Sequence, residues 1–122
     1  MKLFRRKNEV TLNRIHHTVN VVENGERLKL VVNADPMRLV AGLSKAQKKL
    51  TELVGKDENE PTEDEIKEAA EYFAAVMFGR EQTEKLMDFY AGDAACVINV
   101  CGQIFKEQLT DKINKAQKKM NV

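Results

Sequence analysis

Residues 19–32 read VNVVENGERLKLVV, and this stretch decides the N-terminal part of the fold. Apolar and polar residues alternate on both sides of Asn24-Gly25, as expected for two strands that each bury one face. Asn-Gly readily adopts the two positive φ angles of a type I′ turn, which joins antiparallel strands. The sequence therefore predicts a β-hairpin within residues 1–33. The alternation in Val10-Thr11-Leu12 allows a third short strand, and its pairing stays open.

Beyond Asn33 the spacing of the apolar residues becomes helical. Asp35 is a candidate N-cap, and Pro36 suits the first helical position, where its missing N–H has no hydrogen bond to lose. Gly55 can take the left-handed conformation that commonly follows a helix. The sequence therefore predicts a helix that begins at Pro36 and ends near Val54.

Three more helices are expected in the rest of the chain. Thr62 and Glu65 have the spacing of a capping box, in which each side chain bonds the other residue's backbone N–H. A helix is expected to begin there and to end at Gly79. A third helix is predicted over residues 81–91. A fourth and long helix is predicted over residues 93–119, with an aspartate as its N-cap.

Length and composition place these elements in one domain. The chain has 122 residues, 43% of them hydrophobic and only 6% aromatic. A chain of this size buries roughly two-thirds of the surface that its unfolded form exposes, so it can build its own core. We expect a single domain over 1–122, of class α+β and mostly α. The hairpin region covers 1–33, and about four helices fill 34–122.

The formal charge is close to neutral, since 20 Lys and Arg face 19 Asp and Glu. No global field therefore attracts the chain to nucleic acid or to an anionic membrane. Aromatic residues that could stack on bases do not interleave with the basic clusters, which favours solvated faces, with a nucleic-acid-binding regulator as the less favoured alternative. These clusters are Arg5-Arg6-Lys7, Lys45-Lys48-Lys49 and Lys112-Lys115-Lys118-Lys119.

The sequence predicts neither a membrane partner nor secretion. No apolar run approaches the ~20 residues that cross a bilayer. The first seven residues, MKLFRRK, lack the apolar segment of a secretory signal. We therefore expect a protein of the cytoplasm.

Residues that could carry chemistry are sparse. His16 and His17 are neighbours in a predicted strand, so they point to opposite faces and cannot easily share a metal. Cys96 and Cys101 are about 140° apart around a helix, which excludes a disulfide between them and leaves both reduced. Ser44 is the only serine, and no glycine-rich phosphate-binding motif occurs. The sequence predicts no enzymatic activity, no cofactor and no metal site.

The apolar stripe of the last predicted helix raises the question of a partner. It continues at helical spacing over more than twenty residues, longer than a small domain is expected to cover, so a second chain is expected on it. Methionines on such stripes adapt to variable partners, although gap filling in the core is their commoner role. The candidate partner-binding residues taken from the stripes are Phe73, Met77, Phe105, Leu109, Ile113 and Met120.

The layout of the chain resembles a known family. Three segments carry the resemblance: Leu28-Lys29-Leu30-Val31-Val32-Asn33, Phe89-Tyr90-Ala91-Gly92-Asp93 and Val97-Ile98-Asn99-Val100-Cys101-Gly102. Together with the helices between them, they look like the small tail assembly chaperones of long-tailed phages and prophages of Gram-positive bacteria. The resemblance covers most of the chain and is one of layout more than of a residue-level motif.

The resemblance implies a non-enzymatic protein in the cytoplasm of the bacterial host. Such a chaperone coats the long, helical, apolar-rich tape-measure protein and keeps it soluble until tail-tube subunits polymerise around it. The resemblance also implies homo-oligomers and a longer product made by a programmed frameshift. The alternative from the same layout is another small phage structural or adaptor protein, such as a head-tail connector or a tail component.

Overall fold

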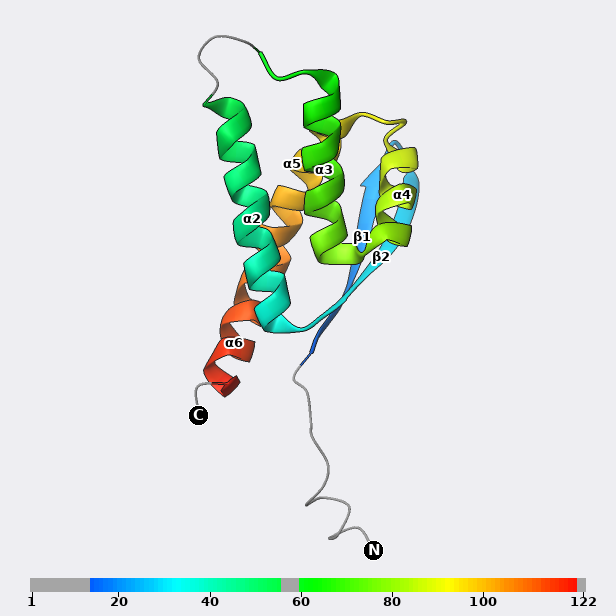
Figure 1. Ribbon diagram of the computed structural model, residues 1–122. Coiled ribbons are helices and arrows are strands. Elements are labelled where there is room, and N and C mark those ends of the chain that lie inside the picture. The colour runs from blue at the N-terminus through cyan, green and yellow to red at the C-terminus, as the bar shows by residue number, and fades with distance from the viewer. Residues whose placement is uncertain (1–13, 56–59, 121–122) are drawn as a thin grey trace, which may run out of the picture.

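The structure is a computed structural model that describes residues 14–55 and 60–120. A hairpin is followed by helices, so the fold is α+β and mostly α, as predicted (Figure 1). The elements are β1 (Ile15–Glu23), β2 (Glu26–Ala34), α2 (Pro36–Val54), α3 (Glu63–Phe78), α4 (Arg80–Phe89), α5 (Ala94–Ile104), the π-helix η1 (Phe105–Leu109) and α6 (Thr110–Met120). The possible third strand over residues 10–12 lies outside the described residues.

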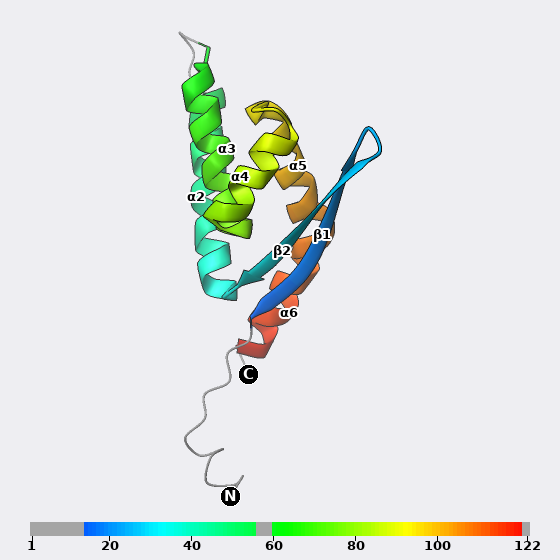
Figure 2. The same ribbon diagram turned by 90° about the vertical axis from the view of Figure 1, so that its right-hand side faces the viewer.

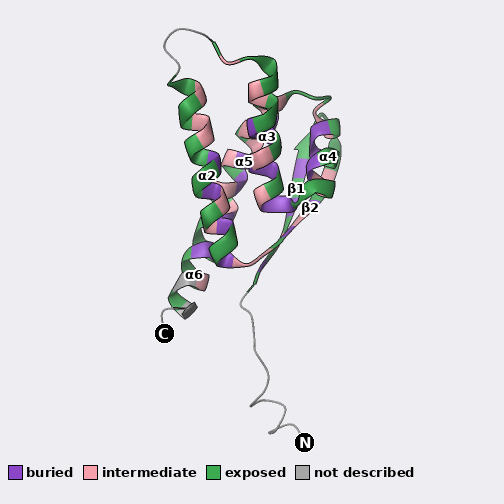
Figure 3. Ribbon diagram, viewed as in Figure 1, coloured by how far each residue is buried: buried purple, intermediate pink, exposed green. Residues whose placement is uncertain are grey.

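The hairpin turns where the sequence predicts. Asn24 and Gly25 both have positive φ angles, 51° and 82°, as a type I′ turn requires. The strands pair antiparallel in an unbroken register from Glu23 opposite Glu26 to Ile15 opposite Ala34. One face of the hairpin is buried against the helices, and the other is open to solvent (Figures 2 and 3). The buried face carries Ile15, Val19, Val21, Leu30 and Val32.

Helix α2 has the predicted bounds but not the predicted caps. Asp35 stands at the N-cap position, yet its side chain makes no capping hydrogen bond. The expectation of a left-handed Gly55 is wrong, because its φ is −81°. Its N–H donates instead to the carbonyl oxygen of Thr51 at 2.9 Å, which continues the helical pattern.

Helices α3 and α4 meet at a glycine. The capping box that begins α3 is confirmed: the Glu65 N–H donates to Thr62 Oγ1 at 3.1 Å, and the Thr62 N–H donates to Glu65 Oε1 at 3.2 Å. Gly79 ends α3 at a φ of 82°, as expected, and its carbonyl oxygen accepts from Thr83 Oγ1 at 2.7 Å. Helix α4 ends at Phe89, earlier than predicted.

The last predicted helix begins as expected but contains a π turn. Asp93 caps α5 by accepting from the Cys96 N–H at 3.2 Å. In η1 the Thr110 N–H donates to the carbonyl oxygen of Phe105, five residues back. Buried Ile104 and Leu109 are also five residues apart, which in a regular α-helix would turn them about 140° away from each other. The π turn takes up the extra residue, so both side chains reach the core.

Helices α2 and α3 lie side by side and approach closely at a glycine (Figure 1). A Cβ atom built on Gly42 would be 2.6 Å from Val76 Cγ1, closer than two carbon atoms can pack. Lys49 and Tyr72 make a second contact between these helices, with the lysine Nζ 5.3 Å from the ring centroid. The glycine therefore sets the distance between the two helices.

We expect Gly42→Ala to destabilise the fold. Overpacking costs about 1–3 kcal/mol, which exceeds the gain of ~1 kcal/mol from replacing a helical glycine by alanine. The matched control is Gly102→Ala in α5, where an added Cβ meets nothing within 4 Å, so this variant should gain stability. Chemical denaturation measures both. Equal stabilisation by the two substitutions would contradict the close contact.

Candidate protein-binding groove

A small groove lies between α2 and the chain segment that runs from η1 into α6. Its volume is about 180 Å³. Pockets for small-molecule ligands commonly measure ~300–1,000 Å³, so this groove fits one apolar side chain better than a free substrate. The lining residues are Val40, Leu43, Ser44, Gln47, Phe105, Thr110, Ile113 and Asn114.

The groove has apolar walls and an uncharged polar rim. Val40 and Leu43 stand one helical turn apart on the face of α2 that packs against the core. Phe105 and Ile113 form the opposite wall, and the π turn between them sets their relative orientation. Since no Asp, Glu, Lys or Arg lines the groove, an ionic ligand has no counter-charge here. The arrangement suits an apolar side chain presented by another polypeptide.

The six predicted partner-binding residues do not form one surface in the structure. Phe105 is half-buried and Ile113 is 6% exposed, and both line the groove. Phe73 and Met77 are buried on α3, and Leu109 is fully buried, so these three belong to the hydrophobic core. Met120 is the last residue of α6, and the position of its side chain is not described.

The apolar stripe of the last helix is covered by the chain itself as far as Ala116. Helix α6 packs on α2 and β1, Ile113 is buried, and Ala116 is half-buried against the core. The expectation that the stripe exceeds what one domain covers is therefore wrong for these turns. Within the described residues, a partner can still reach this stripe where Phe105 and Ile113 line the groove. Sequence reasoning did not name Val40 or Leu43 as partner-binding residues, although both line the groove.

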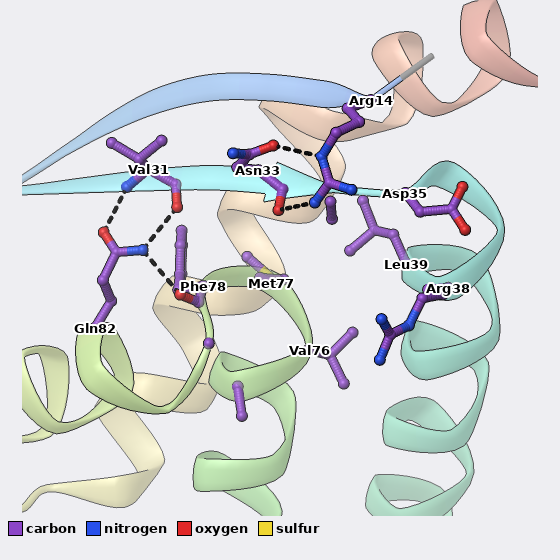
Figure 4. Close-up of a pocket in the computed structure, with 13 residues that line it drawn as sticks. Arg14, Val31, Asn33, Asp35, Arg38, Leu39, Val76, Met77, Phe78 and Gln82 are labelled. Atoms are coloured by element: carbon purple, nitrogen blue, oxygen red, sulfur yellow. Dashed lines mark hydrogen bonds between the residues drawn. The ribbon is translucent and has the colours of Figure 1, made fainter. Parts of the chain in front are cut away.

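A second cavity of about 440 Å³ lies between β2, the start of α2 and the end of α3 (Figure 4). The Gln82 amide bridges its edge: Oε1 accepts from the Val31 N–H at 2.7 Å, and Nε2 donates to the carbonyl oxygens of Val31 and Phe78, each at 2.8 Å. Arg14 donates to Asn33 Oδ1 and to the Asn33 carbonyl oxygen. These polar groups already have partners within the chain, which indicates a structural role.

We expect Gln82→Ala to lower the free energy of unfolding by about 1–3 kcal/mol, because three backbone groups lose their partner. Gln82→Glu should be least stable at neutral pH, where a carboxylate oxygen faces two carbonyl oxygens. A protonated carboxyl can donate a hydrogen bond to one of these carbonyl oxygens, and a carboxylate cannot. The pKa of the introduced carboxyl is therefore raised in the folded state. The variant therefore regains stability below the ordinary Glu pKa and loses it as the pH rises through the raised pKa.

Denaturation at several pH values measures this dependence. The exposed Glu81→Ala is the control on the same helix and should change stability little. A Gln82→Glu variant as stable as the wild type at pH 7 would contradict the bridging role of the amide.

A wider hollow of about 780 Å³ lies between α3 and α4. Its charged lining residues have both signs, so no single charge is concentrated there. They are Lys67, Glu68, Glu71, Arg80, Glu84 and Asp88. All six are exposed, which indicates a solvated surface.

The histidines and cysteines lie apart from the groove. His17 Nε2 is 2.8 Å from Gln108 Oε1 and so ties β1 to η1, while His16 is exposed on the other face of the strand. Within the described residues, no three His, Cys, Asp or Glu side chains gather as metal ligands would. Both cysteines are free thiols, as expected.

The two thiols differ in their surroundings. Burial raises the pKa of Cys101 to about 12. Cys96 Sγ donates a hydrogen bond to Asp93 Oδ2 at 3.2 Å, which raises the pKa of the thiol and lowers that of the carboxyl. Neither thiol is therefore activated as a nucleophile.

Alkylation by iodoacetamide at pH 8 should modify Cys96 slowly and leave Cys101 unmodified in the native protein. In denaturant both thiols should react at the same rate, because burial and the hydrogen bond are lost. Asp93→Ala should speed the native reaction at Cys96, since the hydrogen bond that holds the proton is gone. Mass spectrometry of the digested protein assigns each site. Native labelling of Cys101 as fast as Cys96 would contradict its burial.

Comparison of the chain with protein-family models, with curated proteins and with solved structures found no match. None of the described helices has both the length and the apolar character of a bilayer span.

Proposed function

We propose that this protein is a non-enzymatic tail assembly chaperone of a phage or prophage. It acts in the cytoplasm of the bacterial host, where it binds the tape-measure protein until tail-tube subunits assemble around it. The observation that carries the proposal is the apolar groove between α2 and η1–α6, which contains Phe105 and Ile113. The resemblance in layout supplies the identity of the partner.

The groove supports a helical partner because of its shape and chemistry. Two helices form its walls, and an amphipathic helix lying between them can insert one apolar residue per groove. The rim residues Ser44, Gln47 and Asn114 can bond polar groups that flank the inserted residue. A tape-measure protein, long and helical, offers such residues at regular intervals.

The size of the groove also fits a coating function. Burial of one Leu or Phe side chain contributes only about 1.5–3 kcal/mol, so a single copy holds its segment weakly. Many copies along one partner raise the overall affinity without tighter individual contacts. Weak single contacts also allow the copies to be displaced when tail-tube subunits arrive.

Filling the groove tests the proposal. Ser44 is exposed and lines the groove, so Ser44→Trp should occlude it without disturbing the core. The matched control is Lys48→Trp, which adds the same side chain at an exposed position of α2 that does not line the groove. When each is co-expressed with the tape-measure protein of the same phage, the wild type and Lys48→Trp should keep it soluble and co-purify. Ser44→Trp should not.

Failure of the wild type to co-purify with the tape-measure protein would contradict the chaperone function. Equal co-purification by Ser44→Trp would instead leave the function and move the binding site elsewhere. Rings or tubes formed by the purified protein alone would favour a structural or connector role. Duplex DNA binding that weakens steeply with salt would favour a nucleic-acid-binding regulator.

A further inference from the structure

Phe105 and Ile113 form one wall of the groove because a π turn lies between them. The two residues are eight positions apart, which in a regular α-helix would turn their side chains about 80° from each other. The π turn η1 takes up one extra residue. The offset then corresponds to seven positions of an α-helix, so both side chains lie on nearly the same side. The location of the π turn therefore determines whether this wall forms.

Two hydrogen bonds from Thr110 hold the π turn at this location. The Thr110 N–H donates to the carbonyl oxygen of Phe105, and the Thr110 Oγ1 donates to the same oxygen at 2.9 Å. In a regular α-helix a threonine hydroxyl reaches the carbonyl oxygens three or four residues back, and this one reaches five residues back. The hydroxyl bond therefore stabilises the π geometry relative to α-helical geometry.

Thr110 is also the point where this hydrogen bonding meets the groove. Its side chain is exposed and lines the groove, yet the hydroxyl proton is donated to the chain's own backbone. Gln108, in the same turn, is held instead by His17 of β1, and neither of these two residues lines the groove. The contact that fixes the π turn beside the groove is thus the one made by Thr110.

We propose that Thr110 is a positioning residue of the groove. Its hydroxyl holds Phe105 and Ile113 in the arrangement that receives the apolar side chain of the partner. The inference rests on the proposed chaperone function, because it concerns binding at the same groove. Since the hydroxyl acts through the Phe105 carbonyl oxygen, its loss should weaken binding even when the new side chain is more apolar.

Two substitutions at this position have opposite expected effects. Thr110→Val keeps the branched shape and removes the hydrogen-bond donor, whereas Thr110→Ser keeps the donor and removes the methyl group. If the side chain acted by apolar contact with the partner, valine would bind at least as well as threonine, and serine would bind less well. A positioning role predicts the reverse: valine weakens binding and serine preserves it.

Thr51→Val is the matched control. The Thr51 Oγ1 donates to the carbonyl oxygen of Gln47 at 2.9 Å, so the substitution also removes one exposed hydroxyl bond to a residue that lines the groove. That bond has the four-residue offset of a regular α-helix, and Thr51 does not line the groove. Its loss should leave the walls in place.

Release from the partner measures the effect. Each variant is co-purified with the tape-measure protein of the same phage, the complex is immobilised through the tape-measure protein, and release is followed after dilution. Thr110→Val should be released about three to ten times faster than the wild type, as expected for the loss of one hydrogen bond. Thr110→Ser and Thr51→Val should be released at the wild-type rate. Chemical denaturation should show similar stability for the two valine variants.

Hydrogen exchange of the amide at residue 110 tests the π turn in the protein alone. Thr110→Val should exchange faster at this amide than the wild type, because the turn opens more readily without the hydroxyl bond. Thr51→Val should leave this exchange rate unchanged.

The results that would overturn the inference differ from those that bear on the proposed function. If the wild type binds the tape-measure protein and Thr110→Val is released at the same rate, only the positioning role is wrong. Faster release of Thr110→Ser than of Thr110→Val would also overturn it and would indicate direct contact. Unchanged exchange at residue 110 in Thr110→Val would contradict the role of the hydroxyl in the turn. A wild type that does not bind the tape-measure protein would overturn the proposed function and this inference together.

Discussion

A two-stranded ribbon is only marginally stable in water, so the burial of one hairpin face against the helices is the constraint on which this structure depends. Val19, Leu30 and Val32 supply that face and are almost fully buried. Burial alone does not fix how the ribbon is oriented on the helices. The hydrogen bonds of the Gln82 side-chain amide help to fix this orientation, because they join β2 to the end of α3.

Signals that act within a few residues predicted the fold well. The Asn24-Gly25 turn, the Thr62–Glu65 capping box and the Asp93 cap each depend on one short-range interaction, and all three are present. The conformation of Gly55 and the π turn were not predicted. The π turn arises because residues on both sides of it must reach one core, and that requirement involves distant helices.

The candidate site was less accessible to sequence reasoning. An apolar stripe has the same spacing whether it faces its own core or a partner, so Phe73, Met77 and Leu109 could not be distinguished from Phe105 in advance. Their burial depends on how α3 and η1 pack. The groove also needs Val40 and Leu43, which are more than sixty residues from Phe105 in the chain. Only the packing of α2 on α6 brings these walls together.

The π turn makes the orientation of α6 depend on the exact number of residues in this segment. A π turn has the geometry of an α-helix into which one residue has been inserted. The orientation of α6 about the helix axis therefore differs from the orientation that a regular continuation of α5 would give it. Loss of one residue there would rotate α6 by about 100° relative to α5. That rotation would turn Ile113 and Ala116 away from the core and disturb the packing of α6 on α2 and β1. The number of residues at this one point therefore determines both the wall of the groove and the packing of the last helix on the core.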